Sequence, residues 1–212
     1  DAGEMRDQLM IFITAGHETT ATGLTFTFYL LGRHPEFQAQ VRAEADAVLG
    51  HGLAGAGVID RLIVTRMVVK EALRLYPPAC ALSRAAVVDD VVNGYPITAG
   101  SLILLSPWAT RRLPDFWADP ERFDPDRFSP EGEAGRHRHA WIPFGAGPRA
   151  YIGVHPAMLE MLIVTAAVTQ ANELRCPQDR VPLAAAATLR PAVPLSCLLT
   201  ARRGARKAHH AG

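Results

Sequence analysis

The segment of residues 1–31 constrains the fold of this chain more than any other feature. Its apolar residues would cover most of the circumference of a helix, which suits a helix buried on nearly all sides. They are Leu9, Ile11, Phe12, Ile13, Leu24, Phe26, Phe28, Leu30 and Leu31. No cap precedes this helical pattern, so we expect the segment to come from the middle of a longer protein. We predict one long buried helix with other elements packed around it.

A polar patch interrupts this apolar helix at its centre. Residues 15–20 read Ala-Gly-His-Glu-Thr-Thr, which places a glycine, a carboxylate and two hydroxyls among apolar neighbours. Glycine inside a helix costs about 1 kcal/mol relative to alanine, and a buried carboxylate costs more unless it is paired. Such local violations are expected at functional sites. The structural alternative is a threonine that bonds back to the preceding turn and a glutamate that points to solvent.

A glycine-rich loop in residues 141–161 is the second unusual segment. Pro143 keeps its apolar start extended, and three glycines allow the backbone to turn tightly beside something flat: Gly145, Gly147 and Gly153. Arg149 and Tyr151 lie where this loop meets the N-terminus of the next helix, which favours an anion. The loop could hold a planar, negatively charged ligand above one protein donor atom. An ordinary glycine-rich turn before a core helix is the alternative.

The other segments predict a mainly helical domain with small sheets. Helical patterns cover residues 36–49, 59–75 and 152–172, the first of them amphipathic. Residues 82–92 and 95–98 predict two strands joined by a hairpin at Asn93-Gly94, and residues 102–105 predict a buried strand. Residues 107–143 predict an irregular loop that Phe116, Trp117, Phe123 and Phe128 pin to the body. Residues 173–201 predict a terminal hairpin.

Several charged residues stand out within these elements. Glu71 and Arg74 share a helix face at i,i+3 and can pair, although a surface salt bridge worth under about 1 kcal/mol is the ordinary interpretation. Arg127 could reach inward from the irregular loop as a fixed charge. Arg84 lies within the first strand, where a solvent-facing side chain is the alternative.

Composition excludes some classes of function. A chain of 212 residues, 49% of them hydrophobic, suffices for one sizeable core. The net charge of +1 does not indicate a basic surface for nucleic-acid binding. The three cysteines show no disulfide framework or zinc spacing, which fits a reducing compartment. The longest uncharged run, residues 19–32, is shorter than the ~18 apolar residues of a membrane span.

Four motifs in a fixed order are more specific than any one of them. They are AGHETT (15–20), EALR (71–74), DPERFDPDRF (119–128) and FGAGPRAYIG (144–153). Together they closely resemble the C-terminal half of a cytochrome P-450, a haem-thiolate monooxygenase. The resemblance implies a mainly α fold with small β-sheets (α+β), and residues 1–212 as a single partial domain.

The resemblance implies roles for the residues that match the motifs of the family. Glu18 and Thr19 match the acid–alcohol pair that supplies protons in dioxygen activation, and Ala15 and Gly16 match the widened turn that gives oxygen room. The long helix would cross the distal face of the haem. A buried charge triad of the family is matched by Glu71, Arg74 and Arg127. The positions that bind the haem propionates are matched by Arg84 and Arg149. The haem-binding loop is matched by Phe144, Gly147 and Gly153.

Two residues depart from the pattern of the family. Tyr151 stands where the family has the cysteine whose thiolate binds the haem iron. Tyrosinate is a harder, catalase-type ligand, and its longer ring should push the haem away or swing out. Pro156 stands where an aromatic residue is usual, in the first turns of a helix where proline is tolerated. His155, four residues further on, could be an opportunistic ligand instead.

These resemblances imply a function with open alternatives. The first is a haem b protein of the monooxygenase lineage that inserts one oxygen atom of dioxygen into a small organic substrate. Its electrons would come from NAD(P)H through a ferredoxin, a flavodoxin or a reductase. The second is a non-catalytic remnant, and the third is a tyrosine-ligated haem peroxidase. Whether the chain is an active enzyme stays open, because the cysteine is replaced and the N-terminal half of the family, a further expected partner, is absent. We expect a cytoplasmic location for a bacterial-type protein, with an anchor in that absent half left open.

Overall fold

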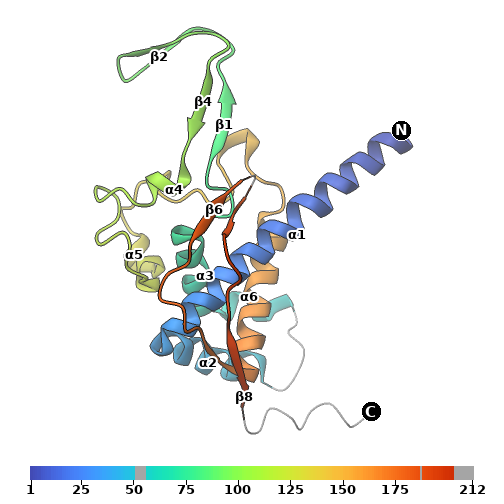
Figure 1. Cartoon of the computed structure of the whole chain (residues 1–212), viewed down its shortest axis with the longest axis vertical. Helices are drawn as coiled ribbons and strands as arrows, with labels where there is room; N and C mark the ends of the chain where they lie inside the picture. Colours follow the sequence, from blue (N-terminus) through green and yellow to red (C-terminus); the bar gives the residue numbers. More distant parts are fainter. Residues whose placement is uncertain (51–55, 187, 203–212) are drawn as a thin grey trace.

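The body of the protein is a packed group of four helices (Figure 1). The computed structural model describes residues 1–50, 56–186 and 188–202, without the side chains of residues 2, 11–15 and 56. The helices are α1 (Ala2–Arg33), α2 (Pro35–Leu49), α3 (Ile63–Leu75) and α6 (Val154–Ala171). The predicted helical segments are confirmed, apart from the start of α3. The mainly α fold with small sheets is confirmed as well.

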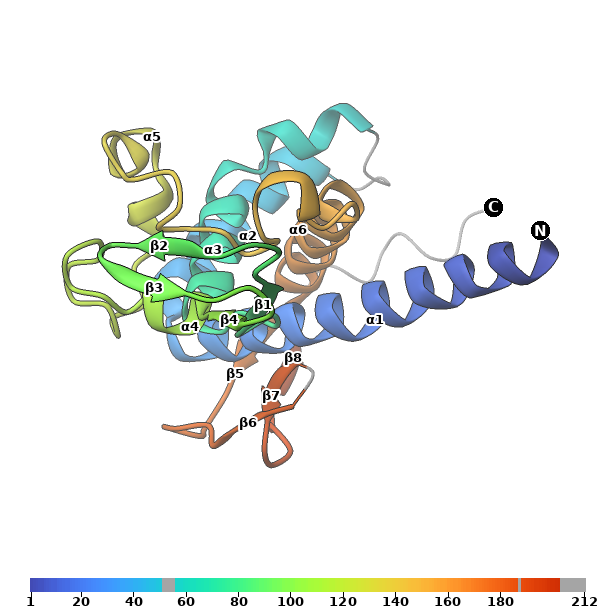
Figure 2. The ribbon, with the colours of Figure 1, turned by 90° about the horizontal axis from the view of Figure 1, so that it is seen from above.

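Helix α1 is buried over only part of its length. Phe26, Tyr29, Leu30 and Leu31 are buried in its C-terminal part, whereas Met5, Leu9 and Met10 are each more than half exposed. Figures 1 and 2 show the N-terminal part extending away from all other elements. The expected burial of residues 1–31 on nearly all sides is therefore wrong for this part, because no described element packs against it. The side chains of Ile11, Phe12 and Ile13 lie outside the described residues.

The N-terminus of α1 carries a cap. The Asp1 carboxylate accepts a hydrogen bond from the backbone N–H of Gly3 at 2.9 Å. This bond satisfies one of the N–H groups that a helix leaves unpaired at its start. The expectation of an uncapped helix is therefore wrong.

Helix α6 packs against the other three helices of the body. Its buried residues include Ala157, Met161, Leu162 and Ala166, which pack with residues of α2 and α3 in one cluster. By length and hydropathy α6 could also cross a membrane, with a third of the segment buried here. The sequence did not predict such a segment. Packing against α1, α2 and α3 gives its apolar residues a role in the core of the domain.

The start of α3 differs from the prediction of one helix over residues 59–75. A 3₁₀ helix, η1 (Ala56–Arg61), is followed by a break at Leu62 and then by α3. Glu44 of α2 supplies the missing cap, because its carboxylate accepts from the N–H groups of Val64 and Thr65 at 2.7 and 2.9 Å. The Thr65 hydroxyl donates to the same carboxylate at 2.7 Å. A residue of one helix thus caps the next helix.

Replacing Glu44 with alanine should lower the free energy of unfolding by about 1–2 kcal/mol, since three donors lose their acceptor. Urea unfolding followed by circular dichroism measures this change. Glu44→Gln is the matched control, because its amide oxygen still accepts, and we expect it to lose less. Equal losses in the two variants would contradict a capping role.

Two small sheets form an arm that projects from the body (Figure 1). β1 (Leu82–Ala85) pairs with β4 (Leu102–Leu105), and β2 (Asp90–Val92) pairs with β3 (Tyr95–Ile97). The predicted turn at Asn93-Gly94 is confirmed, with φ angles of 51° and 86°. The predicted burial of residues 102–105 is wrong, because Leu102, Leu104 and Leu105 are exposed. No described element covers these three side chains.

The irregular segment between the arm and the glycine loop contains only short helices. They are α4 (Pro107–Thr110), η2 (Pro125–Phe128) and α5 (Pro130–Glu133). Trp117, Phe123 and Phe128 are buried and fasten the segment as predicted. Phe116 is 43% exposed, so its predicted anchoring role is wrong.

The terminal hairpin is confirmed and lies against α1. β5 (Asn172–Arg175) pairs with β8 (Leu198–Ala201), and β6 (Leu183–Ala185) pairs with β7 (Leu189–Pro191). The Gln38 side chain ties this hairpin to α1, since its amide donates to the carbonyls of Leu31 and Leu174 at 2.9 Å each. The hairpin therefore forms part of the scaffold of α1.

Candidate functional site

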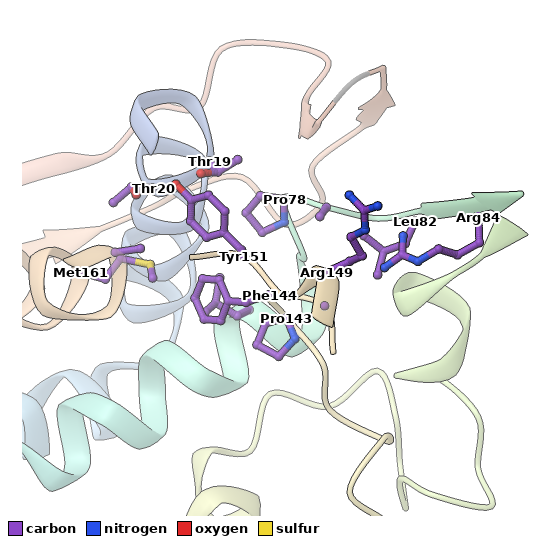
Figure 3. Close-up of a pocket in the computed structure, with 14 residues that line it drawn as sticks. Thr19, Thr20, Pro78, Leu82, Arg84, Pro143, Phe144, Arg149, Tyr151 and Met161 are labelled. Carbon is purple, nitrogen blue, oxygen red and sulfur yellow. The ribbon is translucent and has the colours of Figure 1, made fainter. Parts of the chain in front are cut away.

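A cavity of about 300 Å³ lies between α1 and the glycine loop (Figure 3). Its lining is mostly apolar, with hydroxyl groups on one wall and two guanidinium groups on one side. It is lined by Thr19 and Thr20 of α1, by Leu73, Pro78, Ala79, Leu82 and Arg84, by Pro143, Phe144, Gly145, Arg149 and Tyr151 of the loop, and by Ala157 and Met161 of α6. An apolar cavity with a few polar groups is typical of a small-molecule or cofactor site.

The glycine loop has a backbone that only glycine adopts without strain. Gly145 and Gly147 have φ angles of 75° and 72°, in the region that disfavours other residues. The short 3₁₀ helix η3 (Gly147–Arg149) follows, and the N–H of Tyr151 donates back to the carbonyl of Phe144 at 2.8 Å. This bond closes the loop and places Phe144 and Tyr151 on the same side of the cavity.

The Tyr151 ring crosses the cavity from the loop toward α1 (Figure 3). Its hydroxyl lies 3.6 Å from where a Cβ atom on Gly16 would stand. Ring atoms lie 2.6 Å from the corresponding position on Gly153, so any larger residue at 153 would clash with the ring. The rings of Phe144 and Tyr151 are nearly parallel, with centroids 6.4 Å apart. Tyr151 thus fills the space between the loop and the helix.

The polar patch of α1 is divided between two faces of the helix. Thr20 is buried and Thr19 is half-buried, and both line the cavity. Glu18 is exposed and does not line the cavity, and its carboxylate accepts from the Thr188 hydroxyl at 2.5 Å. Gly16 faces the Tyr151 hydroxyl, whereas the side chain of Ala15 lies outside the described residues. The structure therefore brings Thr19 to the cavity and leaves Glu18 beside the terminal hairpin.

Arg84 and Arg149 lie together on one side of the cavity (Figure 3). Arg84 is half-buried on β1 and donates to the carbonyl of Ser83 at 2.7 Å, while Arg149 is exposed. Within the described part of the chain, neither makes an ion pair. Two adjacent guanidinium groups without carboxylate partners suit an anionic ligand group.

Glu71 and Arg74 form a buried ion pair behind the cavity. Both side chains are fully buried, and two bonds of 2.6 and 2.8 Å join the guanidinium to the carboxylate. Arg127 Nε lies 3.5 Å from the same carboxylate, and the N–H of Asp124 donates to it at 3.0 Å. Burial raises the pKa of Glu71, and the pairing with Arg74 opposes that shift. The interpretation as a surface salt bridge is therefore wrong.

The remaining donors of Arg74 bind the irregular segment. The guanidinium donates to the carbonyls of Arg111, Pro120 and Arg122 at 2.9, 2.7 and 3.1 Å. It also lies over the Trp117 ring, 5.0 Å from its centroid. Arg74 thus fastens α3 to residues 111–122, a role that the sequence spacing of the EALR motif does not reveal.

His155 and Pro156 lie in the first turn of α6 and are both exposed. Neither residue lines the cavity, so this arrangement gives His155 no role as an alternative ligand. Sequence reasoning gave no site role to several residues of the cavity wall, among them Leu82 and Met161, or to Thr188. No local signal marks Thr188, because its contact with Glu18 spans 170 residues.

The sequence matches a family model over residues 1–197, and the model is that of cytochrome P-450. This chain belongs to the cytochrome P-450 family. It is 39% identical over 175 residues to the cyclooctat-9-en-7-ol 5-monooxygenase of Streptomyces melanosporofaciens, covering 82% of this chain and 38% of that protein. It is 36% identical over 188 residues to cytochrome P-450 4V2 of Mus musculus, covering 88% of this chain and 36% of the relative.

Solved structures place the chain in the same family. A mutant of the cytochrome P-450DA heme domain superposes with a TM-score of 0.90 at 34% identity, covering 96% of this chain and 47% of that one. This P-450 chain spans a little over a third of the length of the two curated relatives. The family implies haem as the cofactor, with electrons from a redox partner.

The cavity of this P-450 chain fits haem in all but one respect. Its apolar walls suit a planar macrocycle, and the two guanidinium groups suit the carboxylates of such a cofactor. The Tyr151 ring, however, lies between the loop and α1, so a planar cofactor held between these two elements would meet the ring.

Proposed function

We propose that this chain is the C-terminal, haem-facing part of a single-domain cytochrome P-450 monooxygenase that acts on a small organic substrate. The observation that carries the proposal is the apolar cavity with Thr19 and Thr20 on one wall, the glycine loop opposite and two guanidinium groups on one side. The name of the Streptomyces relative describes a monooxygenase, which supports this reaction class.

The cavity supports specific roles for its residues. Arg84 and Arg149 would hold the carboxylates of haem b. Thr19 would hold a proton at its hydroxyl on the cavity wall. Glu18, which is bound to Thr188 on the exposed face of α1, would exchange protons with Thr19. Gly16, next to Ala15, keeps α1 thin where it faces Tyr151. The residues that would shape the loop around the cofactor are Phe144, Gly147 and Gly153.

Tyr151 is proposed to stand at the position where the family presents its cysteine to the haem iron. Its backbone position supports this assignment, because the closed loop directs residue 151 into the cavity. Glu71, Arg74 and Arg127 are proposed as a structural triad that fixes residues 111–127 behind the loop. The charge pairing serves the scaffold, because the hydrogen bonds of Arg74 end on Glu71 and on the carbonyls of Arg111, Pro120 and Arg122.

Electrons are proposed to come from NAD(P)H through a ferredoxin, a flavodoxin or a reductase. The N-terminal half of the family is proposed as a further partner of this chain. A cytoplasmic location is proposed if the protein is bacterial. The relatives themselves include a bacterial protein and a plant protein named as chloroplastic. The comparisons give no support to a non-catalytic remnant or to a tyrosine-ligated peroxidase.

Haem titration of the purified chain tests the proposal. Tyr151→Gly and Tyr151→Cys remove the ring from the cavity, so we expect both to bind haem at least about tenfold more tightly than the wild type, a difference of about 1.4 kcal/mol. We also expect the reduced carbon monoxide complex of Tyr151→Cys to give a thiolate-type spectrum. Tyr151→Phe is the matched control, because it keeps the ring and removes the hydroxyl.

The outcomes of this titration are distinct. Binding by none of the variants would contradict the proposed function. Wild type that binds as tightly as Tyr151→Gly would show that the ring moves aside. If Tyr151→Phe then lost binding, the phenol oxygen would be the ligand that holds the cofactor.

Removing either guanidinium should weaken haem binding. In the Tyr151→Cys background, Arg84→Ala and Arg149→Ala should each lower the affinity about tenfold, because a charge-assisted bond contributes roughly 1.5–3 kcal/mol before solvent screening. Spectroscopic haem titration measures the change. Arg175→Ala on β5, which is exposed and outside the cavity, is the control. Equal affinities in all three variants would exclude a carboxylate-binding role.

A further inference from the structure

Two cysteines face each other at the end of the β5–β8 ladder. The ladder pairs Arg175 with Leu198 as its last registered pair. One step further along the same antiparallel register, Cys176 stands opposite Cys197. The segment after β5 and the segment before β8 stay close beyond this point. The Gln178 side chain accepts a hydrogen bond from the Ser196 N–H at 3.1 Å and donates one to the Pro194 carbonyl at 3.2 Å.

The hydrogen-bond pattern identifies the kind of pair that the cysteines form. The Arg202 N–H donates to the Ala171 carbonyl at 3.0 Å, so this opposite pair is a hydrogen-bonded one. Hydrogen-bonded and non-bonded pairs alternate along an antiparallel ladder. Counting from the opposite pair of residues 171 and 202, the opposite pair of Cys176 and Cys197 is a non-hydrogen-bonded pair. Consistent with this, the Cys176 N–H points away from β8 and donates to the Gly32 carbonyl at 3.1 Å.

A non-hydrogen-bonded pair suits a covalent bond between the two side chains. Cα atoms in such pairs lie about 4.5 Å apart, and disulfides need Cα atoms about 4.4–6.8 Å apart. Both cysteines are free thiols here, and both pack in one hydrophobic cluster between the hairpin and α1. The wide sequence spacing gave no sign of this proximity.

The two thiols differ in their environments. Cys176 is 6% exposed, and its Sγ lies 3.7 Å from the carbonyl of Phe28. The pKa of Cys176 is raised to about 12, chiefly by burial and secondly by the hydrogen bond with Cys197. Cys197 is more exposed, so an external reagent reaches it first.

We propose that Cys176 and Cys197 form a disulfide when the chain meets a small disulfide such as oxidised glutathione. The Cys197 thiolate attacks the glutathione disulfide, and one glutathione leaves as its thiolate. Cys176 loses its proton to solvent and attacks the Cys197 sulfur, and the second glutathione leaves. The protein loses two hydrogen atoms in total, and oxidised glutathione becomes two molecules of the reduced form.

The bond would close the terminal hairpin at its base. The closed loop of residues 177–196 contains β6, β7 and Thr188, whose hydroxyl donates to Glu18 of α1. Cys176 itself packs on Gly32 of the same helix. Oxidation would therefore restrain the segment that holds Glu18, while Cys80, which precedes β1, stays outside this arrangement.

Thiol counting on the full chain tests the proposal. The reduced chain has three thiols, and after incubation with oxidised glutathione we expect one, on Cys80, to react with Ellman's reagent under denaturing conditions. Peptide mass spectrometry should show the Cys176 and Cys197 peptides joined. The melting temperature should rise by roughly 5–10 °C on oxidation, because the bond closes a loop in the unfolded chain.

Cysteine variants separate the outcomes. Cys80→Ser should behave like the wild type, whereas Cys197→Ser should keep the Cys176 thiol and show no rise in melting temperature. Circular dichroism of each reduced variant verifies its fold. Three reactive thiols after oxidation, a stable mixed disulfide on Cys197 alone, or a bond that includes Cys80 would each overturn the proposal.

Discussion

Glu71→Ala is expected to lower the free energy of unfolding by about 3–5 kcal/mol, because it leaves a buried guanidinium without its counter-charge. Arg74 is fully buried, and two of its bonds end on the Glu71 carboxylate. The same change removes the acceptor of the Asp124 N–H and the partner of Arg127. The loss should therefore loosen residues 111–127 together with α3. Urea unfolding followed by circular dichroism and tryptophan fluorescence measures it.

Asp60→Ala is the matched control for this prediction. Asp60 forms an ion pair with Arg66 at 3.6 Å, and its side chain is 92% exposed. An exposed pair contributes at most about 1 kcal/mol, so the control should change stability little. If Glu71→Ala cost no more than Asp60→Ala, the buried pair would not hold the irregular segment.

Gly32→Ala is expected to lower the free energy of unfolding by about 1–3 kcal/mol or more, through overpacking between α1 and the terminal hairpin. A Cβ atom on Gly32 would stand 2.6 Å from Cys176 Sγ and 2.8 Å from the Cys176 backbone nitrogen. The backbone cannot yield without breaking the bond from the Cys176 N–H to the Gly32 carbonyl. The gain of about 1 kcal/mol in helix propensity from alanine offsets only part of this cost.

Gly3→Ala in the first turn of the same helix is the control with the opposite sign. Among the described side chains, a Cβ atom there would meet Asp1 Oδ1 alone, at 3.6 Å. The variant should be neutral or more stable by up to about 1 kcal/mol, since only the helix propensity changes. Thermal and urea unfolding of both variants compare the two effects. Equal behaviour of the two would contradict the close packing at Gly32.

Local patterns account for the elements that the sequence predicted correctly. The four long helices follow from apolar periodicity, and the hairpin at Asn93-Gly94 follows from two residues that accept positive φ. Gly145 and Gly147 predicted a tight loop, because only glycine adopts a backbone with positive φ without strain. The order of four motifs then identified the cytochrome P-450 family, which the family model matches over residues 1–197.

Burial was predicted less well, because it depends on which elements pack together. The apolar residues of β4 and of the first turns of α1 have the composition of a core, yet no described element covers them. Conversely, the pair of Glu71 and Arg74 is fully buried, which the family resemblance implied and the i,i+3 spacing alone did not. Spacing along one helix cannot show what lies opposite its face.

The sequence by itself determined the four long helices, the hairpin at Asn93-Gly94, the tight loop and the family. Only the tertiary structure decided that Tyr151 reaches α1, that Glu18 binds Thr188 away from the cavity, and that Cys176 meets Cys197. Helix and turn signals arise from interactions within a few residues, which the order of amino acids contains directly. The contacts of the site join residues up to 170 positions apart, and these depend on the packing of whole elements.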